Sequence, residues 1–293
     1  MGSAGTTHPV AVLTDSTVGI PEAMMEDLRI KTVAYYMHRG QEILRDLITI
    51  GREDFLRWLP SARVAPTTAA PGPGDYLDAY EELIGEGAGE IVSIHMGSKI
   101  SAAYESASSA RAMLLERHPQ VRVEVIDSCN AALCQGWMAI QAARASQAGT
   151  SFQAIVAMVK RLVPISHMIQ TADTLRYLYL GGRIGKAQSL LGSVLNIKPL
   201  IGIEDGVIVP LGRTHSRRQA YAAMADMVAT AIGEGVARIG YLHAGALEEA
   251  LKVKELVEAK VHVVESIVGE LTPVLAVHTG PGMAGLCYYR VED

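Results

Sequence analysis

The chain has 293 residues, of which 49% are hydrophobic and 19% are charged, and its formal net charge is −5. This length allows one large or two ordinary domains, and the hydrophobic share excludes a disordered protein. The acidic balance, the lack of a long basic run and an aromatic content of 5% argue against binding of nucleic acid or of an anionic membrane surface.

The three cysteines, Cys129, Cys134 and Cys287, have neither the spacing of a zinc site nor that of a disulfide framework, which is typical of a reducing compartment. Residues 1–10 lack the basic start and long apolar core of a signal peptide, and Gly2–Ser3 resembles a vector remnant. No segment approaches the ~18 consecutive apolar residues that span a bilayer. We therefore expect a cytoplasmic protein without stable membrane insertion.

In the first half of the chain, short apolar runs alternate with helical patterns. We expect strands at Val10–Leu13, Lys31–Tyr36, Ile91–His95 and Val121–Ile126. Helices are expected at Pro21–Leu28, Asp54–Leu59, Tyr76–Ile84 and Ser101–Glu116, with a further helix that ends at Ala145. The segment 61–76 is rich in proline and glycine and predicts a loop. Four strands, each followed by a helix, predict a parallel α/β sheet.

After a helix at Ser151–Leu162 the pattern becomes mixed. Helices are expected up to Leu180, near Ala187–Leu195, at Ser216–Ile232 and at Leu247–Lys260. Strands are expected at His167–Thr171, Arg238–His243, Val261–Val264, Val274–Val277 and Ala284–Tyr289, and Asp205–Gly206 predicts a hairpin. We expect two α/β domains: residues 1–163 with a parallel, Rossmann-like sheet, and residues 164–293 with a mixed sheet.

Small polar residues follow the expected strands of the first domain. They are Thr14, Asp15, Ser16 and Thr17, then Thr67 and Thr68, then Ser98 and Ser101, and finally Asp127 and Ser128. Ligands of open α/β sheets bind beyond the carboxyl ends of the strands, where hydroxyls and helix N-termini suit an anion. Each of these residues could equally well cap the helix that follows it.

Two further segments carry candidate ligand-binding residues. His278 and Thr279 follow the strand expected at Val274–Val277, and the turn Gly280–Gly282 comes next, so backbone N–H groups and an imidazole can meet a polar ligand there. Arg183 follows two glycines that allow a sharp turn, which can direct its guanidinium into a crevice. The alternatives are a tight turn with a hydrogen-bonded histidine and a surface arginine at a helix start.

Several catalytic and cofactor motifs are missing from the sequence. There is no G-x-G-x-x-G after the first strand, no P-loop and no G-x-S-x-G elbow. His215, His243 and His262 lack the spacing of metal ligands. We therefore expect neither a cofactor nor a metal. A small-molecule hydrolase or transferase that uses Asp15 and His278 remains the alternative function.

Seven segments, taken together and in order, resemble the DegV family, the FakB-type fatty-acid-binding proteins. They are LTDST, TTAAPGPGDY, HMGSKISAAYESA, VIDSCNAALCQG, LRYLYLGGRIGKAQSLLGSVLNIKPLI, DGVIVPLGRTHSRRQA and VHTGPGMAGL. The resemblance runs from about residue 10 to the C-terminus. It implies a carrier, not an enzyme by itself, that buries one long-chain fatty acid between two α/β domains and presents the carboxylate to a separate ATP-dependent fatty acid kinase.

The resemblance also implies which residues bind the carboxylate. The family motifs place these residues at Thr68, Ser101, Arg183 and His278, and Ser98, Thr279, Asp15 and Ser16 are possible additional ones. Ala69 and Ala102–Ala103 stand where the family has hydroxyl or glycine residues, so two possible hydroxyl donors are missing.

The hydrophobic composition agrees with an acyl ligand. Burial of an acyl chain contributes ~0.8 kcal/mol per methylene group, and a wall rich in methionine adapts its shape to the chain. The basic residues Arg213, Arg217 and Arg218 are candidates for contact with an acidic kinase surface, or simply form a solvated helix start.

Overall fold

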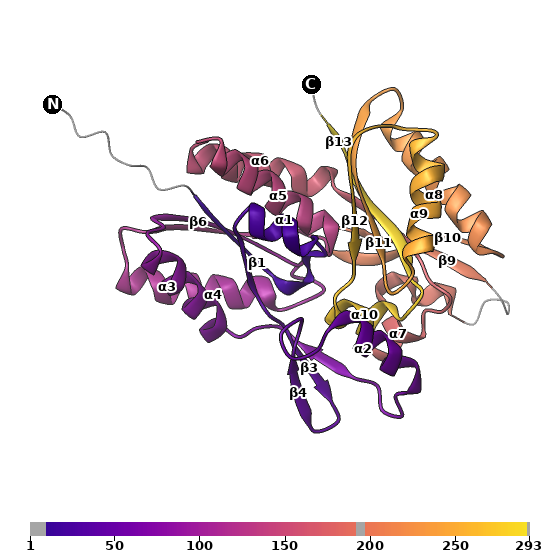
Figure 1. Ribbon diagram of the computed structural model, residues 1–293, viewed down its shortest axis with the longest axis horizontal. Coiled ribbons are helices and arrows are strands. Elements are labelled where there is room, and N and C mark those ends of the chain that lie inside the picture. The colour runs from indigo at the N-terminus through magenta and orange to yellow at the C-terminus, as the bar shows by residue number, and fades with distance from the viewer. Residues whose placement is uncertain (1–9, 192–196, 292–293) are drawn as a thin grey trace.

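The computed structural model describes residues 10–191 and 197–291. Two α/β layers lie side by side, with a smaller lobe below them (Figure 1). The N-terminal layer is built on a four-stranded sheet in the order β2-β1-β6-β7, and all of its strands are parallel. Its strands are β1 (Ala11–Asp15), β2 (Ile30–Val33), β6 (Glu90–His95) and β7 (Arg122–Asp127). The expected parallel sheet is confirmed.

Helices cover both faces of the N-terminal sheet, as buried parallel strands require. The helices α3 (Pro73–Gly85) and α4 (Ala103–Arg117) pack on one face. The helices α5 (Leu133–Gln147) and α6 (Phe152–Ile165) pack on the other, close to the short α1 (Glu22–Asp27) (Figure 1). A 3-10 turn, Ser16–Val18, follows β1 directly. Loops beyond the carboxyl ends of these strands therefore open toward the rest of the molecule.

The smaller lobe contains a three-stranded antiparallel sheet in the order β4-β3-β5. It comprises β3 (Tyr36–Arg39), β4 (Glu42–Arg45) and β5 (Thr67–Ala69), with α2 (Arg52–Trp58) and the 3-10 turn Leu59–Ser61 between β4 and β5. The sequence predicts a loop at Thr67–Thr68, and this expectation is wrong, whereas no prediction covers the β3–β4 hairpin. Backbone pairing with β3 makes this proline-rich segment a strand, which local sequence patterns do not report.

The C-terminal layer has a six-stranded mixed sheet in the order β10-β9-β8-β13-β11-β12. Its strands are β8 (His167–Thr171), β9 (Lys198–Glu204), β10 (Val207–Thr214), β11 (Val236–His243), β12 (His262–Glu270) and β13 (Ala284–Val291). Only β11 and β12 pair in parallel. The helices α8 (Arg217–Ile232) and α9 (Leu247–Glu258) cover the outer face, whereas α7 (Arg176–Leu180), the 3-10 segment Gly185–Leu190 and α10 (Pro273–Thr279) lie near the lobe (Figure 1).

The segment expected to be a strand at Val274–Val277 is the helix α10, so this expectation is wrong. The two valines favour a strand, but Pro273 stands at the first helical position, where its fixed φ and missing N–H suit a helix start. Val274, Ala276 and Val277 pack against the N-terminal part of the chain. The end of the helix expected near Leu195 lies outside the described residues.

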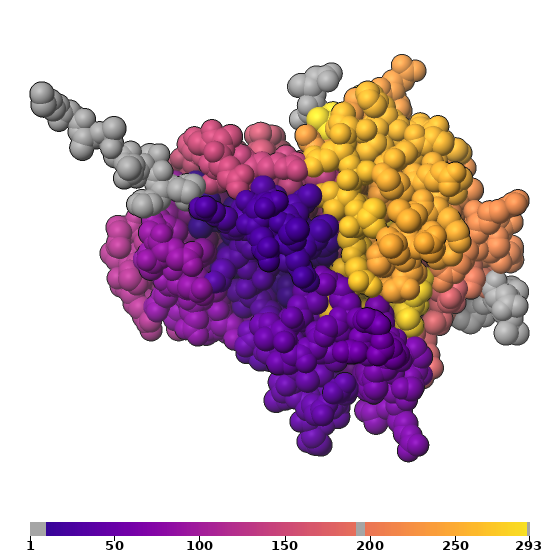
Figure 2. Space-filling model, in the orientation of Figure 1, coloured from indigo at the N-terminus to yellow at the C-terminus, as the bar shows by residue number. Residues whose placement is uncertain are grey.

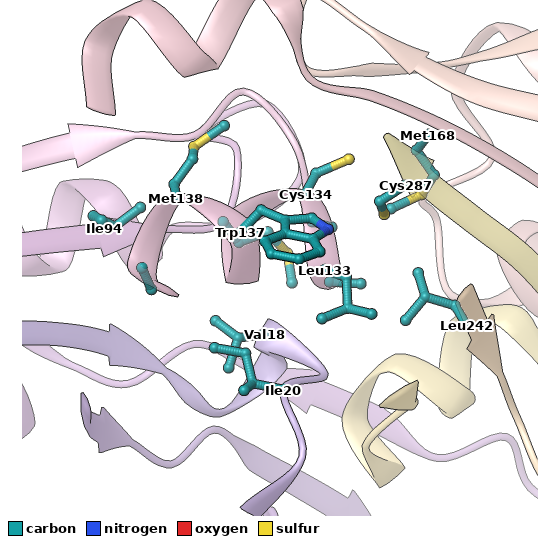
Figure 3. Close-up of a cluster of buried hydrophobic side chains, with 14 of the residues drawn as sticks. Val18, Ile20, Ile94, Leu133, Cys134, Trp137, Met138, Met168, Leu242 and Cys287 are labelled. Carbon is teal, nitrogen blue, oxygen red and sulfur yellow. The ribbon is translucent and has the colours of Figure 1, made fainter. Parts of the chain in front are cut away.

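The two layers share one continuous core. In Figure 3, Trp137 and Leu133 of α5 lie beside Cys287 of β13 and Leu242 of β11. Arg144 of α5 also forms a two-pronged ion pair with Glu265 of β12, with N–O distances of 2.8 and 2.6 Å. In the space-filling view the first and last parts of the chain are in direct contact (Figure 2).

The predicted boundary between residues 163 and 164 falls in the last turn of α6. Across residues 10–191 and 197–291, no helix is both long and apolar enough to cross a bilayer.

Candidate functional site

A cavity lies between the two layers at the carboxyl edge of the parallel sheet, as the fold predicts. It holds about 900 Å³ of empty space, including its open mouth. The loops after β2, β6 and β7 line one side, with Tyr35, Met96 and Ala131 among their residues. Strands of the C-terminal sheet and α10 line the other side.

Most of the wall is apolar. Its aliphatic and methionine side chains come from both layers: Met96, Ile100, Met168, Leu178, Ile203, Ile208, Leu242, Leu271, Val274, Leu275 and Met283. Five alanines, including Ala69 and Ala102, complete it without adding polar groups. A wall of this composition suits an aliphatic ligand.

His278 and Thr68 meet at the polar end of the cavity. The Thr68 Oγ1 and His278 Nε2 atoms are 2.8 Å apart, although the residues are far apart in the chain. Thr68 is held by pairing of β5 with β3, opposite Met37, and His278 lies in the last turn of α10. The sequence therefore predicts the two polar residues, whereas their contact depends on the unexpected strand and helix.

The His278 imidazole is neutral at neutral pH. Burial and, secondarily, the positive charge of Arg183 lower the pKa of His278 to about 4. When Nε2 carries the proton, it donates to Thr68 and leaves the Thr68 hydroxyl hydrogen free for a ligand. The Nδ1 atom is buried without a hydrogen-bond partner in the described residues.

Ser101 and Tyr35 form a second polar pair in the cavity wall, with their hydroxyl oxygens 2.6 Å apart. Burial raises the pKa of Tyr35 well above its usual value, so its hydroxyl stays protonated and can donate. The backbone N–H of Ala103 also donates to Ser101 Oγ, at 3.3 Å. With both lone pairs of Ser101 used in this way, its hydrogen is free for an acceptor in the cavity. Tyr35 is not predicted from the sequence as a site residue, because a tyrosine at the end of an apolar run is typical of the hydrophobic core.

Arg183 is exposed at the mouth of the cavity, where it connects the two layers. Its Nε donates to the Ile100 carbonyl at 3.3 Å, and its Nη1 donates to the Gly181 carbonyl at 2.9 Å. The turn that places it requires Gly182, whose φ is +68°. Gly181 is required for a different reason, because a Cβ there would lie 2.2 Å from Nδ1 of His278.

The remaining candidate residues lie in different places. Thr279 lines the cavity, and its hydroxyl donates a hydrogen bond to the Leu275 carbonyl. Ser98 does not line it, and its backbone N–H donates to Asp127. Ser16 is buried outside the lining and donates to Asp46 at 2.7 Å.

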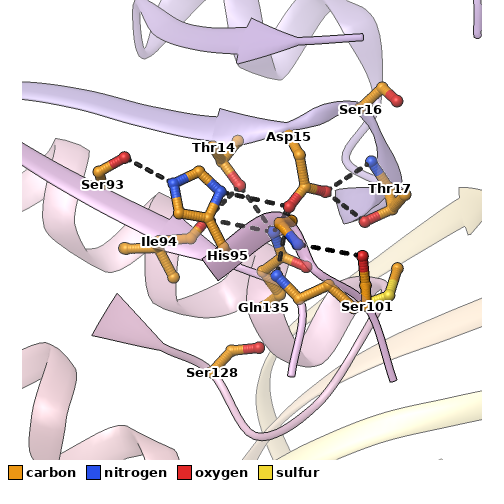
Figure 4. Close-up of polar contacts among 12 residues, drawn as sticks. Thr14, Asp15, Ser16, Thr17, Ser93, Ile94, His95, Ser101, Ser128 and Gln135 are labelled. Atoms are coloured by element: carbon orange, nitrogen blue, oxygen red, sulfur yellow. Dashed lines mark hydrogen bonds and ion pairs between the residues drawn. The ribbon is translucent and has the colours of Figure 1, made fainter. Parts of the chain in front are cut away.

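Asp15 is also buried outside the lining and belongs to a separate polar cluster. The His95 ring lies between Asp15 and Ser93 in Figure 4, at 3.4 Å from the carboxylate of Asp15 and 2.6 Å from the Ser93 hydroxyl. Gln135 and the backbone N–H of Met96 donate to the same carboxylate. Burial alone would raise the pKa of Asp15, but the interaction with His95 and the hydrogen bonds from Thr17 and the Met96 backbone lower it. Asp15 therefore has its partners inside the N-terminal layer and none of them is His278.

Asp46 connects the parallel sheet to α10. One carboxylate oxygen accepts the Ser16 hydroxyl, and the other accepts the backbone N–H of Val274 at 3.1 Å. Ser16 in turn accepts the backbone N–H of Tyr35. Asp46 therefore fixes the start of the helix that carries His278 and, through Ser16, the segment that carries Tyr35. Burial raises the pKa of Asp46 to about 6.

The three arginines that are candidates for partner contact differ in their surroundings. Arg217, a candidate for partner contact, is engaged within the chain by Asp173, Tyr221 and the Gly282 carbonyl, whereas Arg213 and Arg218 are exposed. In the part of the chain that the structure describes, no three His, Cys, Asp or Glu side chains form a group that could hold a metal ion.

Known proteins resemble this chain along nearly its whole length. A family model described as an uncharacterised protein of the DegV family matches residues 9–291. A DegV domain-containing protein of Streptomyces coelicolor is 32% identical over 279 residues, which cover 94% of this chain and 97% of that protein.

Two solved structures resemble the fold closely. The first, described as fatty acid binding of a DegV family protein from Thermus thermophilus, has a TM-score of 0.90 and 29% identity, and the match covers 97% of this chain and 100% of that one. The second, a stearic acid-binding protein from Eubacterium ventriosum, has a TM-score of 0.87 and 25% identity, with 96% and 98% coverage. The chain belongs to the DegV family.

Proposed function

We propose that this protein binds one long-chain fatty acid in the cavity, between a domain of residues 1–163 and a domain of residues 164–293. The observation that carries the proposal is the combination of an aliphatic wall with two hydroxyls, Thr68 and Ser101, each of which can donate to an anion when its partner, His278 or Tyr35, donates to it. The fatty-acid-binding relatives from Thermus thermophilus and Eubacterium ventriosum support the ligand class.

In this proposal the carboxylate accepts hydrogen bonds from Thr68 and Ser101, while the neutral His278 and Tyr35 orient the two hydroxyls. Hydrogen bonds to a charged acceptor are shorter and stronger than neutral ones, so two such donors fix the head group in the site. Arg183 contributes positive charge at the mouth without occupying the cavity. The acyl chain lies along the aliphatic wall, where its burial drives binding.

We further propose that the protein presents the carboxyl group to a separate ATP-dependent fatty acid kinase and has no catalytic activity of its own. The resemblance to the FakB-type proteins, the missing P-loop and the position of the head group near the mouth support this role. Asp15, the acid of the alternative hydrolase or transferase, is held by His95 inside the N-terminal layer. The three cysteines are free thiols, and this supports a location in a reducing compartment such as the cytoplasm.

Native mass spectrometry of the purified protein tests the binding proposal. The expected result is one added mass equal to a long-chain fatty acid, which exchanges for added deuterated palmitate. A protein that neither carries nor takes up a fatty acid, but turns over ester or phosphate substrates, would contradict it.

A phosphorylation assay with a cognate fatty acid kinase tests the presentation proposal. Arg183→Ala is expected to reduce acyl-phosphate formation while fatty-acid affinity stays within about threefold, because Arg183 contacts only two carbonyls at the mouth. Arg176→Ala, an exposed arginine on the nearby α7, is the matched control and is expected to change neither quantity. Equal phosphorylation by both variants would contradict the proposed role of Arg183.

A further inference from the structure

Gln170 is a polar residue at a position of the C-terminal sheet where an apolar one is expected. Side chains alternate between the faces of a strand, so Met168 and Gln170 of β8 share one face and Ile169 has the other. Ile169 packs in the outer core with α8, whereas Met168 and Gln170 line the cavity. Gln170 is thus an amide in an otherwise aliphatic wall. Such a buried polar residue is more informative than an exposed apolar one.

The neighbours of Gln170 across the sheet offer it no polar contact. Gln170 pairs with Ile201 of β9 on one side and with Gly285 of β13 on the other, and Gly285 pairs with Leu242. Gly285 leaves room for the Gln170 side chain, because a Cβ there would lie 2.7 Å from the Gln170 Cβ. The amide therefore sits in a row of aliphatic side chains and one glycine.

The Gln170 amide also has no hydrogen-bond partner among the described residues, although the residue is only 6% exposed. The primary amide has two N–H donors and a carbonyl acceptor. Leaving such a group unpaired in an apolar cavity is unfavourable, so a ligand that pairs with it gains affinity over one that does not. In the proposed function the carboxylate takes its hydrogen bonds from Thr68 and Ser101, so a further polar group on the ligand is needed to pair with the amide.

We propose that Gln170 selects fatty acids that carry a hydroxyl group on the acyl chain. A hydroxyl matches the amide because it can donate to Oε1 and accept from Nε2. A saturated acyl chain leaves Oε1 and Nε2 without a hydrogen bond, and it contacts the rest of the wall as well as a hydroxylated chain does. Gln170 is in this sense a specificity-determining residue, and the inference rests on the proposed function.

The experiment compares stearic acid with a positional series of monohydroxystearic acids by competition against a fluorescent fatty acid. It uses the full chain and the variant Gln170→Leu, with Met168→Leu as the matched control on the same strand and face. The parent is expected to prefer at least one hydroxy isomer, and Gln170→Leu to lower the ratio of its affinity to that of stearic acid about tenfold. Met168→Leu is expected to keep the parent's ratio.

The outcomes separate this inference from the proposed function. A ratio that is the same in the parent and in Gln170→Leu, with stearic acid still bound, overturns the role of Gln170 alone. Failure of the parent to bind any of the fatty acids overturns the proposed function as well. Gln170→Met is a second variant, close in length and apolar, and it must lower the same ratio if the missing amide is the cause. Thermal unfolding of each variant establishes that it is folded.

Discussion

Two histidines of this protein, His95 and His278, stand in contrasting polar clusters. His95 is surrounded by Asp15, Ser93 and an aromatic ring from Tyr76, all inside the N-terminal layer. His278 lines the cavity between the layers, and Thr68 is its one hydrogen-bond partner within residues 10–191 and 197–291. Both clusters join residues that are far apart in the sequence, so sequence separation does not distinguish the two clusters.

The difference lies in whether the polar groups face the cavity. The Asp15 carboxylate accepts from His95, Gln135 and backbone N–H groups, and these bonds stabilise the fold. In the cavity, Thr68 and Ser101 each retain a hydrogen that no protein atom accepts when their partners donate to them. The Asp15 carboxylate is thus engaged inside the N-terminal layer, where Gln135 Oε1 and the Tyr76 hydroxyl have no partner among the described residues but do not line the cavity, whereas donors that face the cavity can bind a ligand. Both sides of this comparison can be tested.

The largest expected effect is on stability, from Asp15→Ala. Removal of the carboxylate leaves several buried donors without their acceptor, and each buried donor left unpaired costs about 1–3 kcal/mol. Urea unfolding should show this loss, while the fraction that remains folded binds palmitate with nearly the parent affinity. A large loss of affinity in folded Asp15→Ala protein would place Asp15 in the binding site.

Acid should reveal opposite contributions from His278 and Asp46. The pKa of His278 is lower in the folded protein, about 4, than in the unfolded chain, about 6.5, so the unfolded chain takes up the proton first. Stability from neutral His278 is therefore complete above about pH 6.5 and is lost as pH falls toward 4, by roughly 3 kcal/mol.

Asp46 has the opposite sign. Its folded pKa of about 6 lies above the unfolded value of about 3.8, so the folded protein takes up the proton first and stability falls as pH rises through this interval. Measured between pH 4 and 7, His278→Asn should flatten the loss of stability in acid, and Asp46→Asn should make it steeper. Identical pH profiles in the two variants would contradict these environments.

Ser101→Ala and His278→Ala should each weaken fatty-acid binding about tenfold or more. Loss of one hydrogen bond to a carboxylate costs roughly 1.5–3 kcal/mol, and loss of His278 leaves the Thr68 hydroxyl without its orienting partner. Isothermal titration with palmitate measures the effect, and Ser98→Ala, which alters a hydroxyl outside the cavity lining, is the control. If both variants bind palmitate with the affinity of the parent protein, Ser101 and His278 do not belong to the binding site.

Tyr35→Phe should have the smallest effect, a few-fold loss of affinity, because the tyrosine acts through Ser101. In the Ser101→Ala background the Tyr35 phenol has no hydroxyl left to orient, so Tyr35→Phe removes nothing further in the double variant. The loss of affinity of the double variant should therefore equal that of Ser101→Ala alone. Additive losses in this double-mutant cycle would show that Tyr35 contacts the ligand independently.

The sequence predicts the parallel sheet, the mixed sheet and several polar residues around the cavity, because these depend on local periodicity and on motifs. It does not predict that Val274–Val277 is helical, since the helix start depends on Pro273 and on an acceptor, Asp46, that is distant in the chain. It also cannot separate Asp15 from His278 as polar candidates, because only the fold decides which one faces the cavity. Tyr35 and Gln170 are missed for the same reason.

The central claim is that a carboxylate binds between Thr68 and Ser101, and the ¹³C resonance of carboxyl-labelled palmitate tests it most directly. In complex with the parent protein we expect a single bound resonance, whose chemical shift moves in Thr68→Val and in Ser101→Ala because each removes one hydrogen bond to the carboxylate. In Ser98→Ala and in Gln170→Leu it should stay where it is in the parent. A resonance unmoved in both Thr68→Val and Ser101→Ala would contradict the account.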